Sequence, residues 1–260
     1  FRALEITPGA PPAPAKTLPV QSPKYSSDLV RLGDYARFSD REETFPTLSE
    51  RWPADGRTPL QPTPYYFRAA AGEVFRCEVT AGARATEEQP YAWRIGRWPG
   101  EATAESGKLM IAPGDTAALQ FTVPEEGVYE LSVGGSVRGV THGLTRRQGF
   151  RGTGSWFFFV PPGTLAFRVE ASALGRRRTA AAVKDGDGRI VWRGEIENAG
   201  RQEIAVPPEQ AGKAWFITYS TIEPTVRIEG VPPWCALTPA DLLTPRECLG
   251  AATPPPASGG

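Results

Sequence analysis

The sequence has little histidine, methionine and cysteine: its 260 residues include one histidine (His142), one methionine and three cysteines. A single histidine cannot build a zinc site that needs several histidine ligands. His142 could serve a Ser-His-Asp triad, but neither a Gly-x-Ser-x-Gly motif nor a phosphate-binding glycine loop accompanies it. We therefore expect no catalytic residue, no metal and no cofactor.

The sequence also lacks an excess of charge and a long apolar run. Lys and Arg number 29 and Asp and Glu number 29, so the net charge is zero. Nucleic-acid binders carry a basic excess that displaces phosphate counterions, so we expect no nucleic-acid partner. Without an apolar run of about 18 residues, we expect no membrane-spanning segment. The first residue, Phe1, fits a mature exported protein (periplasmic, cell-surface or extracellular) or a segment of a longer one.

Glycine and proline are abundant instead, with 28 and 27 residues, which is typical of short strands joined by turns. Leu119, Phe121 and Val123 alternate with polar residues as in a half-buried strand, and residues 124–127 (PEEG) are expected to form a hairpin loop. The expected fold class is all-β, with two tandem antiparallel β-sandwich (jelly-roll-like) domains. The expected divisions are an extended Pro-rich arm with loops over 1–60, a first sandwich over 61–134, a Gly-rich linker over 135–154, a second sandwich over 155–245 and a Pro/Gly-rich tail over 246–260.

Four stretches carry a family resemblance: WFFFVPPGTLAFRVE, AAVKDGDGRIVWRG, QEIAVPPEQAGKAWFITY and VRIEGVPPWCALTPADLL. Their order resembles the bacterial pre-peptidase C-terminal type of β-sandwich, and especially accessory domains at the C-termini of large secreted polysaccharide-degrading proteins. The resemblance covers residues 155–243 well and 64–133 loosely. It implies non-catalytic jelly-roll modules that bind glycans or dock against neighbouring domains.

The stretch WFFFV within the second half is apolar on both faces of a strand. Trp156, Phe158 and Val160 would face one side, and Phe157 and Phe159 the other. A membrane-spanning strand needs about 9 to 11 residues, so this run is too short to cross a membrane. We expect Phe157 and Phe159 to lie in an interface, covered by the first sandwich or by an arm.

Exposed aromatic residues with polar neighbours are the candidates for binding a glycan. Trp93 and Trp98 lie beside Arg94 and Arg97 in YAWRIGRW, and Trp52 lies in an expected loop. The five-residue spacing puts Trp93 and Trp98 on opposite faces of a regular strand. Core packing is the alternative for each aromatic residue.

The acidic residues and cysteines allow further readings. Asp185-Gly186-Asp187-Gly188 begins like a calcium loop, but position twelve is Ile196 rather than Glu, so an Asp-Gly hairpin tip is favoured. The acidic cluster at 40–43 could supply a glycosidase carboxylate pair or be surface charge. Cys77 is expected in a core, while Cys235 and Cys248 could form a disulfide or stay unpaired.

Taken together, these features favour an exported, non-catalytic binding or interaction protein that contacts a glycan or a protein surface. The alternative is a structural subunit of a larger envelope or surface assembly, held by its extended Pro-rich termini.

Overall fold

The computed structural model describes residues 20, 23–35, 64–82, 87–100, 102–134, 137–141, 145–147, 150–151, 154–172, 178–197, 200–220 and 225–250. Over these ranges the chain is nearly all β, and every strand pair is antiparallel. The helical residues in the same ranges form short 3-10 turns: η1 (Leu32–Asp34), η3 (Pro208–Gln210) and η4 (Arg246–Leu249). The expected all-β fold class is confirmed.

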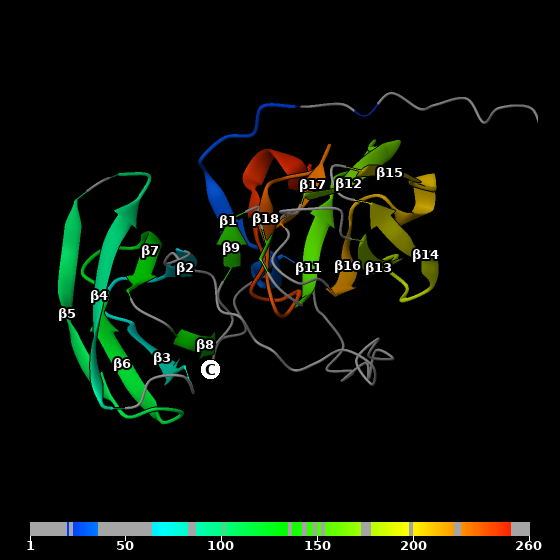
Figure 1. Cartoon of the computed structure of the whole chain (residues 1–260). Coiled ribbons are helices and arrows are strands. Elements are labelled where there is room, and N and C mark those ends of the chain that lie inside the picture. The colour runs from blue at the N-terminus through cyan, green and yellow to red at the C-terminus, as the bar shows by residue number, and fades with distance from the viewer. Residues whose placement is uncertain are drawn as a thin grey trace, which may run out of the picture.

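The first half of the chain forms most of two sheets that enclose one core (Figure 1). A six-stranded sheet has the order β18-β9-β2-β7-β4-β5, and a three-stranded sheet has the order β6-β3-β8. We call the cluster between them the first core; it contains Cys77 and Leu119 from one sheet and Ile95 and Leu131 from the other. The strands are β2 (Tyr65–Ala69), β3 (Val74–Ala81), β4 (Gln89–Trp98), β5 (Thr103–Ile111), β6 (Thr116–Thr122), β7 (Gly127–Val133), β8 (Val137–Thr141), β9 (Thr145–Arg147) and β18 (Trp234–Cys235).

The second half forms two four-stranded sheets around a second core. Their orders are β10-β17-β12-β15 and β11-β16-β13-β14. The second core includes Phe158, Phe167, Val183 and Trp215, and the Trp215 ring meets the Phe167 ring edge to face at 5.3 Å. The strands are β10 (Phe150–Arg151), β11 (Gly154–Val160), β12 (Ala166–Ser172), β13 (Arg178–Lys184), β14 (Ile190–Glu197), β15 (Gly200–Ala205), β16 (Lys213–Ser220) and β17 (Thr225–Glu229).

The expected alternation is present, but one expected hairpin is wrong. Leu119 and Phe121 of β6 are buried, while their neighbours Gln120 and Thr122 are exposed. However, β6 pairs with β3, whereas β7 pairs with β2 and β4. Residues 124–127 therefore carry the chain from one sheet to the other, because alternation fixes the buried face of a strand and not its partner.

The Asp-Gly hairpin tip, by contrast, is confirmed. β13 and β14 pair directly across it, and Gly188 has a φ of +81°, which favours glycine. Asp185 is buried, and its Oδ1 accepts hydrogen bonds from the backbone N–H of Asp187 (3.0 Å) and of Arg189 (2.9 Å). The carboxylate is thus used to close the turn.

The glycine-rich segment over 135–154 contains three short strands that attach to different sheets. β8 pairs with β3, β9 pairs with β2 and β18, and β10 pairs with β17. Strand β18 comes from the C-terminal region, so the six-stranded sheet combines strands of the first half with a strand of the C-terminal region. The division into two tandem domains stays a prediction.

The described ranges contain no helix that is long and apolar enough to cross a membrane.

Candidate functional site

The face of WFFFV that points away from the second core is covered by the C-terminal segment. Phe159 is only 3% exposed, whereas Phe157 is partly buried and its ring lies 4.8 Å from that of Phe216. Phe157 N–H donates to the Ala236 carbonyl at 2.8 Å, and Ala236 N–H donates to the Phe157 carbonyl at 3.0 Å. Residue 236 thus pairs with the middle of β11.

Phe159 belongs to a third cluster, which we call the junction cluster. It contains residues from the N-terminal segment, from β2 and β7, from β11 and from the C-terminal segment. Its buried members are Leu29, Leu32, Tyr66, Val128, Phe159, Trp234, Ala236, Leu242, Leu243 and Cys248. The outer side of the six-stranded sheet is therefore packed against the second half of the chain.

Three aromatic rings form the centre of the junction cluster. Tyr66 meets Trp234 edge to face at 5.0 Å and meets Trp98 in the same way at 5.4 Å. The Trp98 and Trp234 rings are 6.2 Å apart, also edge to face. Such pairs add to the hydrophobic effect of burial.

The N-terminal and C-terminal segments are clasped together beside this cluster. Strand β1 (Leu29–Arg31) pairs with β19 (Leu243–Pro245). Ser26 donates from its backbone N–H and its hydroxyl to the Glu247 carboxylate at 2.7 and 2.6 Å. Arg246 donates to the Asp28 carboxylate at 2.8 Å and to the Tyr35 hydroxyl at 2.7 Å.

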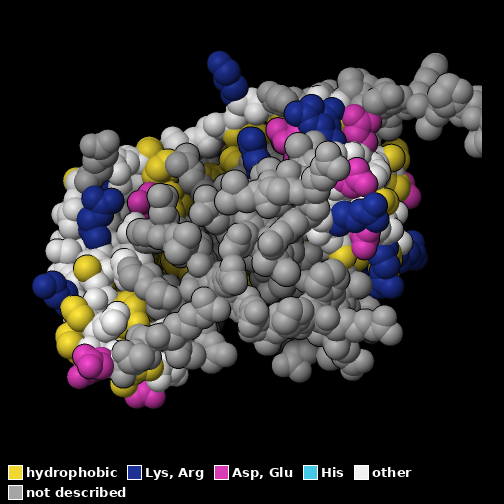
Figure 2. Space-filling model, viewed as in Figure 1, with side chains coloured by type: hydrophobic (Ala, Val, Ile, Leu, Met, Phe, Trp, Pro, Cys, Tyr) yellow, Lys and Arg dark blue, Asp and Glu magenta, His cyan; other side chains and the backbone are white. Residues whose placement is uncertain are grey.

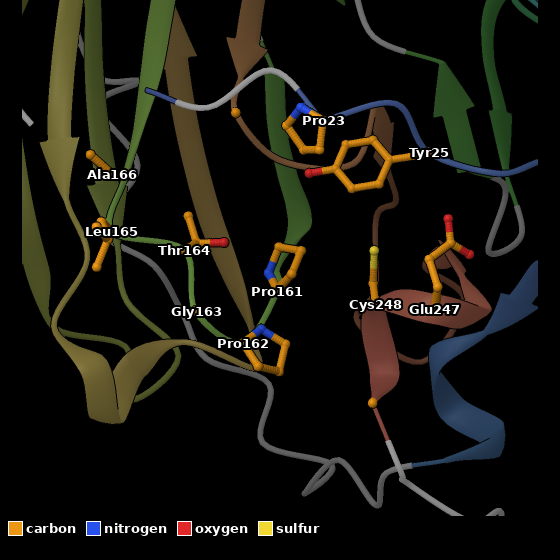
Figure 3. Close-up of a pocket in the computed structure, with 12 residues that line it drawn as sticks. Pro23, Tyr25, Pro161, Pro162, Gly163, Thr164, Leu165, Ala166, Glu247 and Cys248 are labelled. Atoms are coloured by element: carbon orange, nitrogen blue, oxygen red, sulfur yellow. The ribbon is translucent and has the colours of Figure 1, made fainter. Parts of the chain in front are cut away.

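A groove lies between this clasp and the Pro-Pro-Gly turn after β11 (Figure 3). It encloses about 420 Å³. One wall comes from the turn and the start of β12, and the other from the clasp. The lining residues are Pro23, Tyr25, Pro161, Pro162, Gly163, Thr164, Leu165, Ala166, Gly230, Glu247, Cys248 and Gly250.

The groove keeps two of its groups protonated and one charged. Burial raises the pKa of the Tyr25 hydroxyl well above its ordinary value, and the neighbouring Cys248 and Glu247 add to the rise. Burial, with a smaller contribution from Glu247, raises the pKa of the Cys248 thiol to about 12. Burial acts to raise the pKa of Glu247 as well, but hydrogen bonds from Ser26 outweigh it and lower the pKa. At neutral pH the lining therefore carries a phenol, a thiol and a carboxylate.

The predicted glycan-binding residues do not gather in one place. Trp93 packs against the first core, and a Cβ added at Gly107 would lie 2.8 Å from its ring. Trp98 packs against the junction cluster, on the opposite face of β4 as its spacing indicates. Trp52 lies outside the described residues.

The two predicted arginines are exposed and paired with nearby acids, Glu130 of β7 and Glu125 of the segment before it. Arg94 lies 4.0 Å from the Glu130 carboxylate, and Arg97 forms a salt bridge with Glu125. Figure 2 shows basic and acidic side chains interspersed over the visible described surface, with no large field of one sign. Arg94 and Arg97 thus have partners already within the chain.

The cysteines fall into three different clusters. Cys77 lies in the first core, as expected, Cys235 in the second core and Cys248 in the junction cluster. No disulfide joins Cys235 to Cys248 in this structure. His142 and the acidic cluster at 40–43 lie outside the described residues, which themselves contain no group of three or more His, Cys, Asp or Glu residues that could hold a metal ion.

The sequence gives no pattern that marks the groove. Tyr25 and Cys248 lie far apart in the chain, and neither is near the Pro-Pro-Gly stretch at 161–163 in the sequence. No family model and no curated protein matches this sequence. The resemblance to the pre-peptidase C-terminal type of β-sandwich stays a prediction.

Proposed function

We propose that the protein is an exported, non-catalytic binding protein whose tandem β-sandwich modules contact a glycan or the surface of another protein. The observation that supports this proposal is the groove between the Pro-Pro-Gly turn and the clasp. Its volume lies within the range of about 300 to 1,000 Å³ that is usual for ligand sites. Its lining combines apolar rings with a few polar groups, as binding sites do.

The walls of the groove are also held in place by hydrogen bonds and strand pairing. Gly212 N–H donates to the Val160 carbonyl at 2.7 Å, and Thr164 N–H donates to the Pro161 carbonyl at 3.2 Å. The opposite wall is held by the β1–β19 pairing and by the Ser26–Glu247 hydrogen bonds. A preformed site loses less entropy when it binds a ligand.

The alternative of a structural subunit held by its termini receives no support from the described part of the N-terminal region. Residues 29–31 pair with residues 243–245 of the same chain, and Leu29 and Leu32 are buried in the junction cluster. This segment is thus engaged within its own chain. The Pro-rich residues 1–19 and 251–260 lie outside the described ranges.

Glycan and peptide arrays probed with the labelled protein test the proposal. We expect saturable binding to members of one class. The variant Leu165→Lys changes the groove, and Arg94→Ala changes the exposed surface of β4, so their effects locate the site. Wild-type protein that binds neither class would overturn the proposed function.

A further inference from the structure

We propose that the groove binds an extended, proline-containing peptide segment of a partner protein that carries Lys or Arg beside its prolines. This inference rests on the proposed function. It limits the ligand to a protein segment and places the binding site in the groove.

The walls have the surface that a polyproline II segment needs. Such a segment makes no internal hydrogen bonds, keeps its carbonyls available and packs its rings on aromatic and proline surfaces. In Figure 3 Pro23 and Tyr25 lie on one side of the groove, and Pro161 and Pro162 lie on the other. Leu165 extends the apolar wall and is 50% exposed.

The groove also offers a hydrogen-bond donor for the carbonyls of such a segment. The Tyr25 hydroxyl points into the space between Pro23 and Pro161 (Figure 3), and no described residue hydrogen-bonds it. Like any tyrosine, it keeps its proton at neutral pH, and burial raises its pKa further. A phenol beside apolar rings can donate to a peptide carbonyl, and aromatic-lined grooves are the usual docking sites of polyproline segments.

Charge selects a basic segment. Glu247 is the charged residue of the lining, and its carboxylate is close enough to Tyr25 to raise the pKa of that hydroxyl. The twelve lining residues include neither Lys nor Arg. Ser26 hydrogen-bonds the Glu247 carboxylate through uncharged groups, so a Lys or Arg next to the prolines of a ligand would meet the negative charge of Glu247.

A glycan fits the same lining less well. The hydroxyls that surround a sugar ring each need a polar partner when they lose water. The groove offers two side-chain hydroxyls, Tyr25 and Thr164, and one carboxylate, while proline and leucine make up much of its walls. These observations favour a peptide over a glycan.

Fluorescence anisotropy with the full chain and a fluorescein-labelled peptide of sequence APPAPPARPA tests the inference. We expect saturable binding that weakens by about tenfold, or ~1.4 kcal/mol, when all the prolines are replaced by alanine. Replacing the arginine of the peptide by glutamate should weaken binding to a similar degree. The variant Glu247→Gln should reduce the difference between the arginine and glutamate peptides, whereas Glu78→Gln, on β3, should preserve it.

A matched pair of leucine variants distinguishes damage to the binding site from unfolding of the protein. Leu165, in the groove, and Leu237, outside its lining, are 50% and 43% exposed, so both should accept lysine without unfolding. Leu165→Lys should weaken binding of the basic peptide by about tenfold, and Leu237→Lys should leave it unchanged. Thermal melting of both variants checks that the fold is kept.

The outcomes distinguish this inference from the proposed function. Equal binding of all three peptides, or equal effects of Leu165→Lys and Leu237→Lys, would overturn the inference. Binding to a glycan array without binding to any peptide would also overturn it but would leave the proposed function standing. If the protein bound neither peptides nor glycans, both the inference and the proposed function would be overturned.

Discussion

At the scale of single residues, Asp185 illustrates how a buried acid can support the fold. It is 7% exposed, and its Oδ1 accepts two backbone N–H bonds within the turn. Asp185→Ala leaves these N–H groups without their acceptor, so we expect the free energy of unfolding to fall by about 1–3 kcal/mol. Asp185→Asn keeps an acceptor oxygen and should cost less. Urea denaturation measures both, and equal losses would contradict this role.

The neighbouring Asp187 gives a prediction about pH. Hydrogen bonds from Lys213 and Gln210 lower the pKa of Asp187 from its ordinary value of 3.8, and the charges of Lys213 and Arg189 act in the same direction. This contribution to stability is present above pH 3.8 and is lost as the pH falls through the lowered pKa in the folded state. Lys213→Met should raise the pKa, and carboxyl carbon NMR titration reads it directly. Arg189→Met is the control and should have a smaller effect.

At the scale of strands, the sequence predicted which faces are buried more readily than which strands pair. Alternation in β6 and the two-faced WFFFV run of β11 were both readable, because side chains alternate across any strand. The sequence predicted a hairpin at residues 124–127, whereas these residues connect two sheets. The alternation in β6 is the same whichever strand it pairs with. The pairing of β1 with β19 could not be foreseen either, because local sequence carries no signal for a contact across some 200 residues.

The β1–β19 clasp yields a prediction about which of its contacts stabilises the fold. Leu29 is 1% exposed in the junction cluster, so Leu29→Ala should lower the free energy of unfolding by about 2–5 kcal/mol. The Arg246 and Asp28 side chains are 50% and 57% exposed, so Arg246→Ala should cost no more than about 1 kcal/mol. Chemical denaturation compares the two. A larger loss for Arg246→Ala would show that polar contacts hold the clasp.

At the scale of the whole molecule, composition predicted the all-β class, but the candidate site is formed only when the chain folds. Glycine and proline content is a property of the whole sequence, and alternation is a local pattern within it, so both can be read without the structure. The groove combines Tyr25, the PPG turn and Cys248, which only the folded chain brings together. The predicted aromatic residues Trp93 and Trp98 instead pack against the first core and the junction cluster. An aromatic residue on a strand looks the same in sequence whether it binds a ligand or packs.

The junction cluster predicts that the first and second cores unfold together. Trp234 of β18 is 5% exposed and packs against Tyr66 of β2 and Trp98 of β4, while Phe159 links the same cluster to β11. We therefore expect one calorimetric transition for the wild-type protein, with equal calorimetric and van't Hoff enthalpies. Trp234→Ala removes the centre of the cluster and should divide unfolding into two transitions. Trp192→Ala, which trims a ring packed on the second core, should lower the melting temperature without dividing it. A single, merely lowered transition for Trp234→Ala would mean that the strand pairing of β9 and β18 couples the cores without the aromatic contacts.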